Sequence, residues 1–339
     1  MLKPYIEKVI NHQNLSIEEA ETAMGIIMDG QATDAQIGSY LTGLRMKGET
    51  VEEITGSARS MREHAALVPL KTKAESLLDI VGTGGDGAHT FNISTTAAFL
   101  IAGTGRKVAK HGNRAASSKC GSADVLAELG VNLDLTPEQV GQCIDEVGIG
   151  FLFAPKFHPA MKHAIGPRRE MGQRTIFNIL GPLTNPAGAT HQLIGVFDPD
   201  LTQPMAEVLG ELGGKAALVV HGHGGLDELT TDGPNRVSHL KDGSVKTYEL
   251  DASNFGLRQA TKDDLRGGDP EINARMMRDI LTGKDDSPRK DVVIFNAAAA
   301  LAADDGDFFS AISEVQQTLE SGEALNKLDQ LIERSQSFG

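Results

Sequence analysis

A basic, hydroxyl-rich segment at 110–122 contains the residues of this sequence best suited to binding a small anion. It reads Lys110-His111-Gly112-Asn113-Arg114-Ala115-Ala116-Ser117-Ser118-Lys119-Cys120-Gly121-Ser122. From Arg106 to Lys119 every charged residue is a lysine or arginine, although the whole chain has a net charge of −14. Positive charge beside glycine backbone amides suits phosphate or pyrophosphate. The segment therefore predicts that the protein binds a phosphate compound.

Two earlier segments carry groups that suit the same kind of ligand. The turn Gly82-Thr83-Gly84-Gly85-Asp86-Gly87 follows a predicted strand, and its glycines allow backbone N–H groups to approach anionic oxygens. The turn has neither the Rossmann spacing nor the Walker A ending. Asp86 within it requires a cationic partner, such as magnesium or a ligand amine. Asn92-Ile93-Ser94-Thr95 begins a predicted helix; it either caps that helix or binds phosphate at its N-terminus, and we favour phosphate binding.

An acidic pair, Asp227-Glu228, follows the predicted strand 216–220. Paired carboxylates in a loop suit Mg²⁺, which binds through few carboxylates and keeps several waters. His221 and His223 raise a zinc alternative, which is weaker because neither a cysteine nor a third histidine lies at a usable spacing.

An arginine pair, Arg168-Arg169, follows Gly166-Pro167, which we interpret as a break in the chain's regular structure. The pair either forms a surface ion pair with Glu170 or binds a ligand carboxylate through two parallel hydrogen bonds. The sequence alone leaves both interpretations open.

The composition narrows the class of protein. The 339 residues suggest about two domains. The sequence pI of about 5.2 and the absence of tryptophan argue against nucleic-acid binding. No apolar run approaches the length of a membrane-spanning helix. Two cysteines, Cys120 and Cys143, provide no disulfide framework, so we expect a cytoplasmic protein.

The pattern of elements predicts a small all-helical domain and a larger α/β domain. Ser16, Thr33 and Thr50 each begin a capping box within residues 1–69, and residues 158–185 return to this helical domain. Short β-branched runs then alternate with helical segments over 70–157 and 186–339, which predicts a mainly parallel central sheet with helices packed on it. Residues 236–250 predict a β-hairpin, and 291–295 a further buried strand before an alanine-rich helix.

Several segments form a combination that is specific to one enzyme family. They are Gly82-Thr83-Gly84-Gly85-Asp86, Asn92-Ile93-Ser94-Thr95, Lys110-His111-Gly112-Asn113-Arg114, Asp227-Glu228 and Thr175-Ile176-Phe177-Asn178-Ile179-Leu180-Gly181-Pro182-Leu183-Thr184-Asn185-Pro186. Together they resemble the anthranilate phosphoribosyltransferase family over nearly the whole chain. The resemblance implies Mg²⁺-dependent transfer of the phosphoribosyl group of 5-phosphoribosyl 1-pyrophosphate (PRPP) to the amine of anthranilate, the second step of tryptophan biosynthesis from chorismate. It also implies an active site at the hinge between the domains and a homodimer formed through the helical domains.

The resemblance further implies roles for individual residues. Ser94, Asp227 and Glu228 would hold a pair of Mg²⁺ ions, while Gly82, Asn113 and Arg168 would contact anthranilate. The residues that would bind PRPP are Gly82, Gly85, Asp86, Thr90, Asn92, Ile93, Ser94, Thr95, Lys110, His111, Gly112, Asn113, Arg114, Ala115, Ala116, Ser117, Ser118 and Ser122. Lys110 would stabilise the departing pyrophosphate. Gln173 stands where the family commonly has an aliphatic residue, and it touches none of these roles.

Two other functions agree less well with the sequence. A pyrimidine nucleoside phosphorylase-like enzyme uses inorganic phosphate and needs no paired-carboxylate Mg²⁺ site, so Asp227-Glu228 counts against it. A non-catalytic relative that binds nucleic acid is disfavoured by the net charge of −14. Because the amine of anthranilate is neutral at pH 7, we expect no essential general base from the protein.

Overall fold

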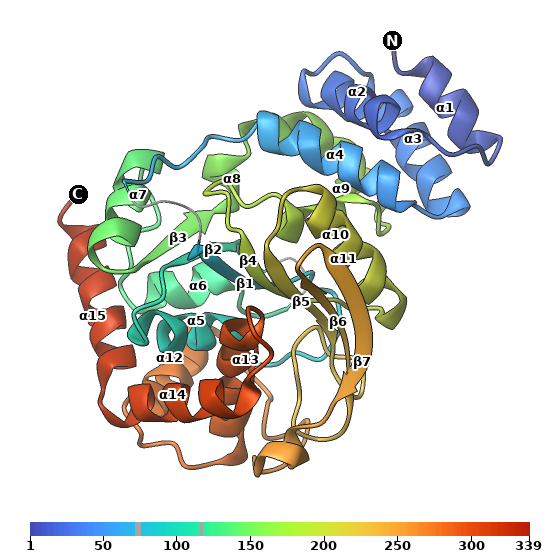
Figure 1. Cartoon of the computed structure of the whole chain (residues 1–339). Coiled ribbons are helices and arrows are strands. Elements are labelled where there is room, and N and C mark those ends of the chain that lie inside the picture. Colours follow the sequence, from blue (N-terminus) through green and yellow to red (C-terminus); the bar gives the residue numbers. More distant parts are fainter. Residues whose placement is uncertain (72–75, 116–117) are drawn as a thin grey trace.

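A seven-stranded sheet forms the centre of the molecule, which is a computed structural model describing residues 1–71, 76–115 and 118–339 (Figure 1). The strand order is β3-β2-β1-β4-β5-β6-β7; the first five strands are parallel, and β6 and β7 are antiparallel. The strands are β1 (Leu78–Gly82), β2 (Val108–Gly112), β3 (Ile149–Phe153), β4 (His191–Gly195), β5 (Ala216–His221), β6 (Asn235–Lys241) and β7 (Ser244–Leu250). The mainly parallel sheet predicted from the sequence is confirmed.

Helices cover both faces of the sheet. They are α1 (Lys3–Ile10), α2 (Ile17–Met28), α3 (Asp34–Lys47), α4 (Val51–Glu63), α5 (Ile93–Gly103), α6 (Ser122–Glu128), α7 (Pro137–Glu146), α8 (Ala154–Phe157), α9 (Lys162–Met171), α10 (Phe177–Leu183), α11 (Thr202–Glu211), α12 (Pro270–Leu281), α13 (Pro288–Ala302), α14 (Phe308–Glu320) and α15 (Glu323–Gln336). Short 3-10 turns lie at Pro159–Met161, Pro199–Leu201 and Ala252–Phe255. Among the described residues, no helix is long and apolar enough to cross a membrane.

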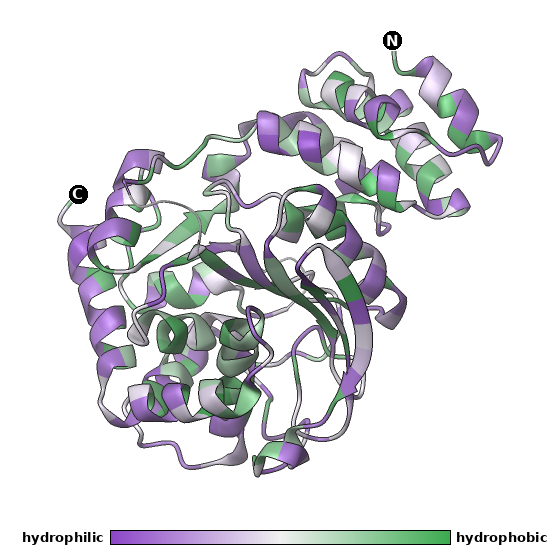
Figure 2. Ribbon diagram, viewed as in Figure 1, coloured by the Kyte–Doolittle hydropathy of each residue, from purple (hydrophilic) through white to green (hydrophobic). Residues whose placement is uncertain are grey.

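The two faces of the sheet belong to two hydrophobic cores. Successive residues of a strand point to opposite faces, so Leu218 of β5 belongs to the core that includes α5 to α7 and α12 to α15, whereas Val219 belongs to the core that includes α10, α11 and the N-terminal helices. Figure 2 shows this pattern, with hydrophobic colour on the central strands and on α5 and hydrophilic colour along much of the outer helix α15. The second core runs without a break into the helical bundle.

The N-terminal helices begin where the sequence predicts. Ser16, Thr33 and Thr50 each accept a hydrogen bond from the backbone N–H three residues later, and the residue there returns one, so all three capping boxes form. Helix α9 packs against α2 and α3, and α10 against α4. These contacts bring residues far along the chain back to the helical bundle (Figure 1).

Two local predictions are wrong. Residues 291–295 are not a strand but part of α13, because the apolar run continues into an alanine-rich stretch that is buried on nearly every side. A short apolar run does not distinguish a buried helix from a strand. Gly166-Pro167 is not a break, since Pro167 lies inside α9 and removes only one backbone donor from the helix.

Candidate active site

A cleft of about 470 Å³ opens at the carboxyl ends of β1 and β2, between the sheet and the α9–α10 segment. The chain builds β2 and β3 on one side of β1 and then returns to place β4 on the other side. In open α/β sheets, ligands bind outside the carboxyl ends of the strands at such a reversal. One wall of the cleft therefore comes from the sheet and its loops, and the other from α9 and α10.

The predicted site residues that the structure describes all line this cleft. They are Gly82, Gly85, Asp86, Thr90, Asn92, Ile93, Ser94, Thr95, Lys110, His111, Gly112, Asn113, Arg114, Ala115, Ser118, Ser122, Arg168, Asp227 and Glu228. Ala116 and Ser117 lie outside the described residues. Residues from separate parts of the sequence, between 82 and 228, thus meet in one hollow.

The acidic pair lies deep in the cleft, on the loop between β5 and β6. The Gly84 N–H donates to Asp227 Oδ2 at 2.6 Å, and the Ser94 N–H donates to Glu228 Oε1 at 3.1 Å. Burial raises the pKa of Glu228 to about 7, although the charge of Lys110 opposes the rise. Burial and the nearby Glu228 and Asp86 carboxylates raise the pKa of Asp227. These neighbouring carboxylates repel one another and would repel an anionic ligand. A cation is therefore expected between the carboxylates and such a ligand.

Glycines allow the acidic loop to lie directly on the strand ends. A Cβ on Gly195 would stand 1.6 Å from the Asp227 carbonyl oxygen, and a Cβ on Gly82 would stand 2.3 Å from Asp227 Oδ2. A Cβ on Gly222 would be 2.1 Å from the Glu228 carbonyl oxygen. A side chain at any of these positions would push the carboxylates away from the cleft.

The acidic pair suits magnesium better than zinc. Among the described residues, no group of three His, Cys, Asp or Glu side chains is arranged to hold a metal ion by itself. Zinc sites need three or four such ligands, whereas Mg²⁺ is commonly held by one or two carboxylates, waters and the phosphates of a substrate. The His221 ring instead bonds the Val196 carbonyl.

Lys110 is a buried cation at the floor of the cleft. Its side chain is on the cleft end of β2, the residue is only 3% exposed, and Nζ donates to the Ile80 carbonyl at 2.7 Å. Ser94 Oγ lies 3.5 Å from the same nitrogen. Burial lowers the pKa of Lys110, and the charges of Asp79 and Glu228 raise it. An ammonium group beside two buried carboxylates is positioned to neutralise added phosphate charge.

Three of the other cations between Arg106 and Lys119 are paired with acidic side chains. Arg106 pairs with Asp304, Lys107 Nζ lies 3.5 Å from Asp145, and Arg114 lies 2.8 Å from Asp124. The segment is also not a single loop, because residues 108–112 form β2. The positive charge that reaches the depth of the cleft is therefore more localised than the sequence suggests.

The start of α5 supplies backbone donors to the cleft. Its N-cap residue, Asn92, makes no capping hydrogen bond with its side chain. The Asn92 amide instead bonds the Cys120 carbonyl and accepts from Asn273 at 2.9 Å. The Ser94 N–H donates instead to Glu228 and the Ile93 N–H to the Phe91 carbonyl, so a carboxylate of the acidic pair lies at the positive end of α5.

Arg168 faces the cleft from the opposite wall. It lies on α9 with its guanidinium 4.9 Å from the centre of the Phe177 ring, and burial lowers its pKa. The neighbours Arg169 and Glu170 lie outside the cleft lining. A half-buried guanidinium on an aromatic ring is suited to a planar carboxylate ligand.

Arg174 is a residue of this region that the sequence did not single out. Its guanidinium donates to the Gly85 carbonyl and stacks 4.0 Å from the centre of the Phe197 ring. Arg174 thereby joins the segment before α10 to the glycine turn across the cleft. In the sequence, only the position next to Thr175 marks Arg174 as a residue of the site, because its partners Gly85 and Phe197 are distant along the chain.

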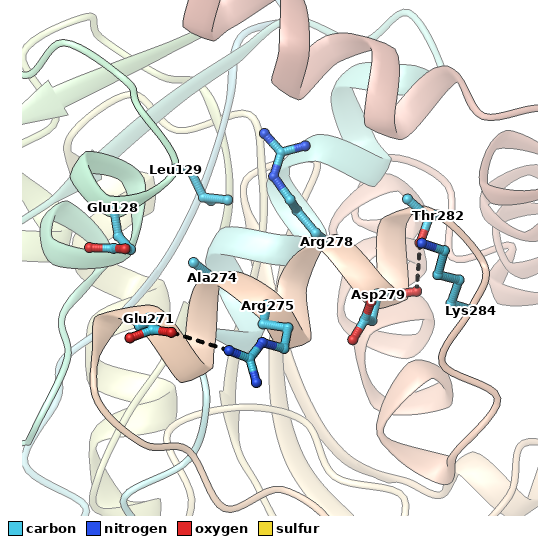
Figure 3. A pocket seen from close by; sticks show the side chains of 9 residues that line it. All are labelled: Glu128, Leu129, Glu271, Ala274, Arg275, Arg278, Asp279, Thr282 and Lys284. Atoms are coloured by element: carbon cyan, nitrogen blue, oxygen red, sulfur yellow. Dashed lines mark hydrogen bonds and ion pairs between the residues drawn. The ribbon is translucent and has the colours of Figure 1, made fainter.

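A second hollow of about 600 Å³ lies between α6 and α12, and none of its lining residues lines the cleft (Figure 3). Its charged side chains largely compensate one another: Arg275 pairs with Glu271, and Arg278 with Asp329 of α15. Both ion pairs are exposed to solvent, where such pairs add little stability and do not hold their side chains in fixed positions. The cleft at the strand ends is therefore the candidate active site.

Known proteins match the chain over its whole length. The family described as "Glycosyl transferase family, helical bundle domain" matches residues 3–65, and "Glycosyl transferase family, a/b domain" matches residues 74–325. The fold and the cleft thus define a glycosyl transferase that joins a helical bundle to an α/β domain. An anthranilate phosphoribosyltransferase from Moorella thermoacetica is 54% identical over 98% of both chains. The chain belongs to the anthranilate phosphoribosyltransferase family.

Solved structures agree with this assignment. The crystal structure of the enzyme from Thermus thermophilus has a TM-score of 0.93 and 44% identity, covering 98% of this chain and 99% of that one. The Saccharomyces cerevisiae enzyme, in complex with PRPP and Mg, has a TM-score of 0.90 and 31% identity, covering 99% of this chain and 98% of that one. Both similarities extend over the helical and the α/β parts.

Proposed function

We propose that this protein transfers the phosphoribosyl group of PRPP to the amine of anthranilate, releasing pyrophosphate, as the second step of tryptophan biosynthesis. One observation carries the proposal: the half-buried pair Asp227-Glu228 faces Lys110 and the start of α5 in the same cleft as Arg168. The cleft thus has a diphosphate end and a carboxylate end. Family membership supports the same reaction.

The diphosphate end is assigned to PRPP. The glycine turn and the start of α5 hold the two acidic residues through their backbone N–H groups, and Lys110 offers a buried ammonium. Ser94, Asp227 and Glu228 would hold a pair of Mg²⁺ ions, as the resemblance to the family implies. The bound metal would neutralise the diphosphate and stabilise the leaving pyrophosphate.

The carboxylate end is assigned to anthranilate. Arg168 can donate parallel hydrogen bonds to the anthranilate carboxylate, while its guanidinium rests on Phe177. Asn113, at the end of β2 on the opposite wall, would face the aromatic amine. This arrangement directs the neutral amine toward the sugar carbon without a base from the protein.

The chain's own residues then contribute by charge and position. As pyrophosphate leaves, positive charge develops on the sugar and negative charge on the leaving group; Lys110 stabilises the negative charge from its buried position. The two walls hold the reactants in line, which removes most of the entropic cost of bringing them together. A nucleoside phosphorylase would not need the acidic pair, and the relatives do not favour it.

We extend the proposal to the organisation of the molecule. Residues 1–69 and 158–185 would form one unit, and 70–157 with 186–339 the other, with the cleft between them. A homodimer would form through the helical units, where Ile10 of α1 and Met46 of α3 are large exposed apolar residues on helices that pack together. Two buried cysteines that do not form a disulfide suit the cytoplasm.

Anthranilate fluorescence tests the proposed function. The purified protein should consume anthranilate when PRPP and Mg²⁺ are both present, and not when either is omitted. Arg168→Ala should mainly raise the KM for anthranilate, whereas Arg169→Ala, a matched control outside the cleft lining, should leave it unchanged. No anthranilate consumption by correctly folded protein would refute the function, and equal rises in both KM values for Arg168→Ala would refute the role of Arg168.

A further inference from the structure

Three chain connections between the helical bundle and the sheet meet beneath the cleft. The Ala66 N–H, after α4, donates to the Phe157 carbonyl before α9 at 2.8 Å. The Val68 N–H donates to the Pro186 carbonyl, after α10, at 3.1 Å. The connection after α4 is therefore hydrogen-bonded to both of the others, and the three connections form a single hinge region.

A buried carboxylate connects this hinge region to β2. Asp79 lies on β1, is fully buried, and accepts from the His111 N–H with Oδ1 at 3.1 Å. Its Oδ2 accepts from Asn185 Nδ2 at 2.8 Å. The same Asn185 amide group donates to the Ala109 carbonyl at 2.8 Å, and its oxygen accepts from the Ala187 N–H at 2.9 Å. Asp79 and Asn185 thus fasten the α10–β4 connection to the strand that carries Lys110.

Making this connection with a buried carboxylate costs free energy, because the charged group loses its hydration. Burial raises the pKa of Asp79 to about 6, while the charge of Lys110 and the hydrogen bonds from Asn185 and His111 lower it. Asp79 does not line the cleft, so it has no direct contact with a ligand there. Both of its oxygens face donors, and only a carboxylate accepts from both at once.

We propose that Asp79 is a positioning residue that fixes the separation between the two walls of the cleft. It holds Asn185, and through it α10 and the Arg168 wall, against the β2 wall of Lys110 and Asn113. This inference rests on the proposed function. The groups assigned to PRPP lie almost entirely on the sheet wall, whereas those assigned to anthranilate are divided between Asn113 and Arg168. A change in wall separation therefore affects anthranilate more than PRPP.

The test removes each side of the Asp79–Asn185 connection in turn. In Asp79→Asn, an amide faces the His111 and Asn185 donors, and one of the two hydrogen bonds is lost. We expect the KM for anthranilate to rise about tenfold, because misplacement by about 1 Å is costly, and the KM for PRPP to change less than about threefold. Asn185→Ala removes the other partner of the same hydrogen bond and should produce the same selective rise. The double variant Asp79→Asn with Asn185→Ala should be no worse than the more affected single variant, because both substitutions break one connection.

Glu53→Gln is the matched control. Glu53 is also a fully buried carboxylate, but it accepts from the Leu15 and Thr50 N–H groups within the helical bundle and does not line the cleft. Its substitution should lower the melting temperature without a selective change in either KM. Calorimetry of PRPP binding with Mg²⁺ shows whether each variant is folded. Turnover of anthranilate by the wild-type protein tests the proposed function separately, so a failure of that function is distinguishable from a failure of this inference. Equal changes in the two KM values for Asp79→Asn, or additive losses in the double variant, would overturn the proposal.

Discussion

Gly195→Ala should disable the acidic pair without touching a ligand-binding side chain. Gly195 ends β4, directly beneath Asp227, and an added Cβ would stand 1.6 Å from the Asp227 carbonyl oxygen and 2.3 Å from its carbon. Because ordinary contacts begin near 3.4 Å, the acidic loop must move by about 1.8 Å, since both contacts involve backbone that cannot rotate aside. Alanine is otherwise acceptable at this position, where φ is not positive.

A displacement of this size is large for the proposed chemistry. Mg²⁺ tolerates little change in ligand distance, and a misplacement of about 1 Å can cost about a hundredfold in rate. We therefore expect kcat/KM for PRPP to fall by at least about a hundredfold, or about 3 kcal/mol of transition-state stabilisation. Steady-state kinetics at saturating anthranilate would measure the fall, and calorimetry would show weaker binding of PRPP with Mg²⁺.

Gly166→Ala is the matched control. Gly166 lies inside α9, and a Cβ there would have nothing within 4 Å, so alanine should leave activity unchanged and add slightly to helix stability. Circular dichroism would establish that both variants are folded. A folded Gly195→Ala variant with kcat/KM within about threefold of wild type would refute the argument that glycine there positions Asp227.

Three further variants test the acidic pair, the buried histidine His158 and the glycine turn. Asp227→Asn with Glu228→Gln should abolish Mg²⁺-dependent turnover in protein with unchanged circular dichroism; residual activity above about 1% would contradict the metal assignment. Burial lowers the pKa of His158 to about 4, so its contribution to stability is present above about pH 6.5 and about 3 kcal/mol is lost as pH falls through 4. His158→Phe should therefore lose less melting temperature between pH 7 and pH 4 than wild type, whereas exposed His12→Asn should not differ from it; an unchanged acid profile for His158→Phe would count against this reasoning. Arg174→Ala should raise the KM for PRPP several-fold by releasing the glycine turn, and equal KM values for the variant and wild type would show that the contact with Gly85 is dispensable.

Features that depend on local rules could be predicted from the sequence. The capping boxes at Ser16, Thr33 and Thr50 need only residues three apart, and the Asp242-Gly243 turn between β6 and β7 needs only residues that accept a positive φ. The cleft residues were found because their motifs are continuous short segments.

Features that depend on distant contacts could not be predicted. Gly195 matters because the Asp227 loop crosses it, and Asp79 because Asn185 reaches it from the hinge; no local pattern marks either residue. The sequence of the helix at 288–302 predicts a strand over 291–295 because the burial of this helix comes from surrounding elements. The cations Arg106 and Lys107 seemed available to a ligand, but their partners Asp304 and Asp145 become neighbours only on folding.

The most direct test of the central claim is to identify both products of one reaction. The protein is incubated with anthranilate, PRPP and Mg²⁺, and the mixture is separated by chromatography with mass detection. We predict N-(5-phosphoribosyl)anthranilate and pyrophosphate in equal amounts, and neither product when Mg²⁺ is removed by a chelator. Unchanged anthranilate with folded protein, or release of ribose 1-phosphate from a pyrimidine nucleoside and inorganic phosphate, would contradict the account.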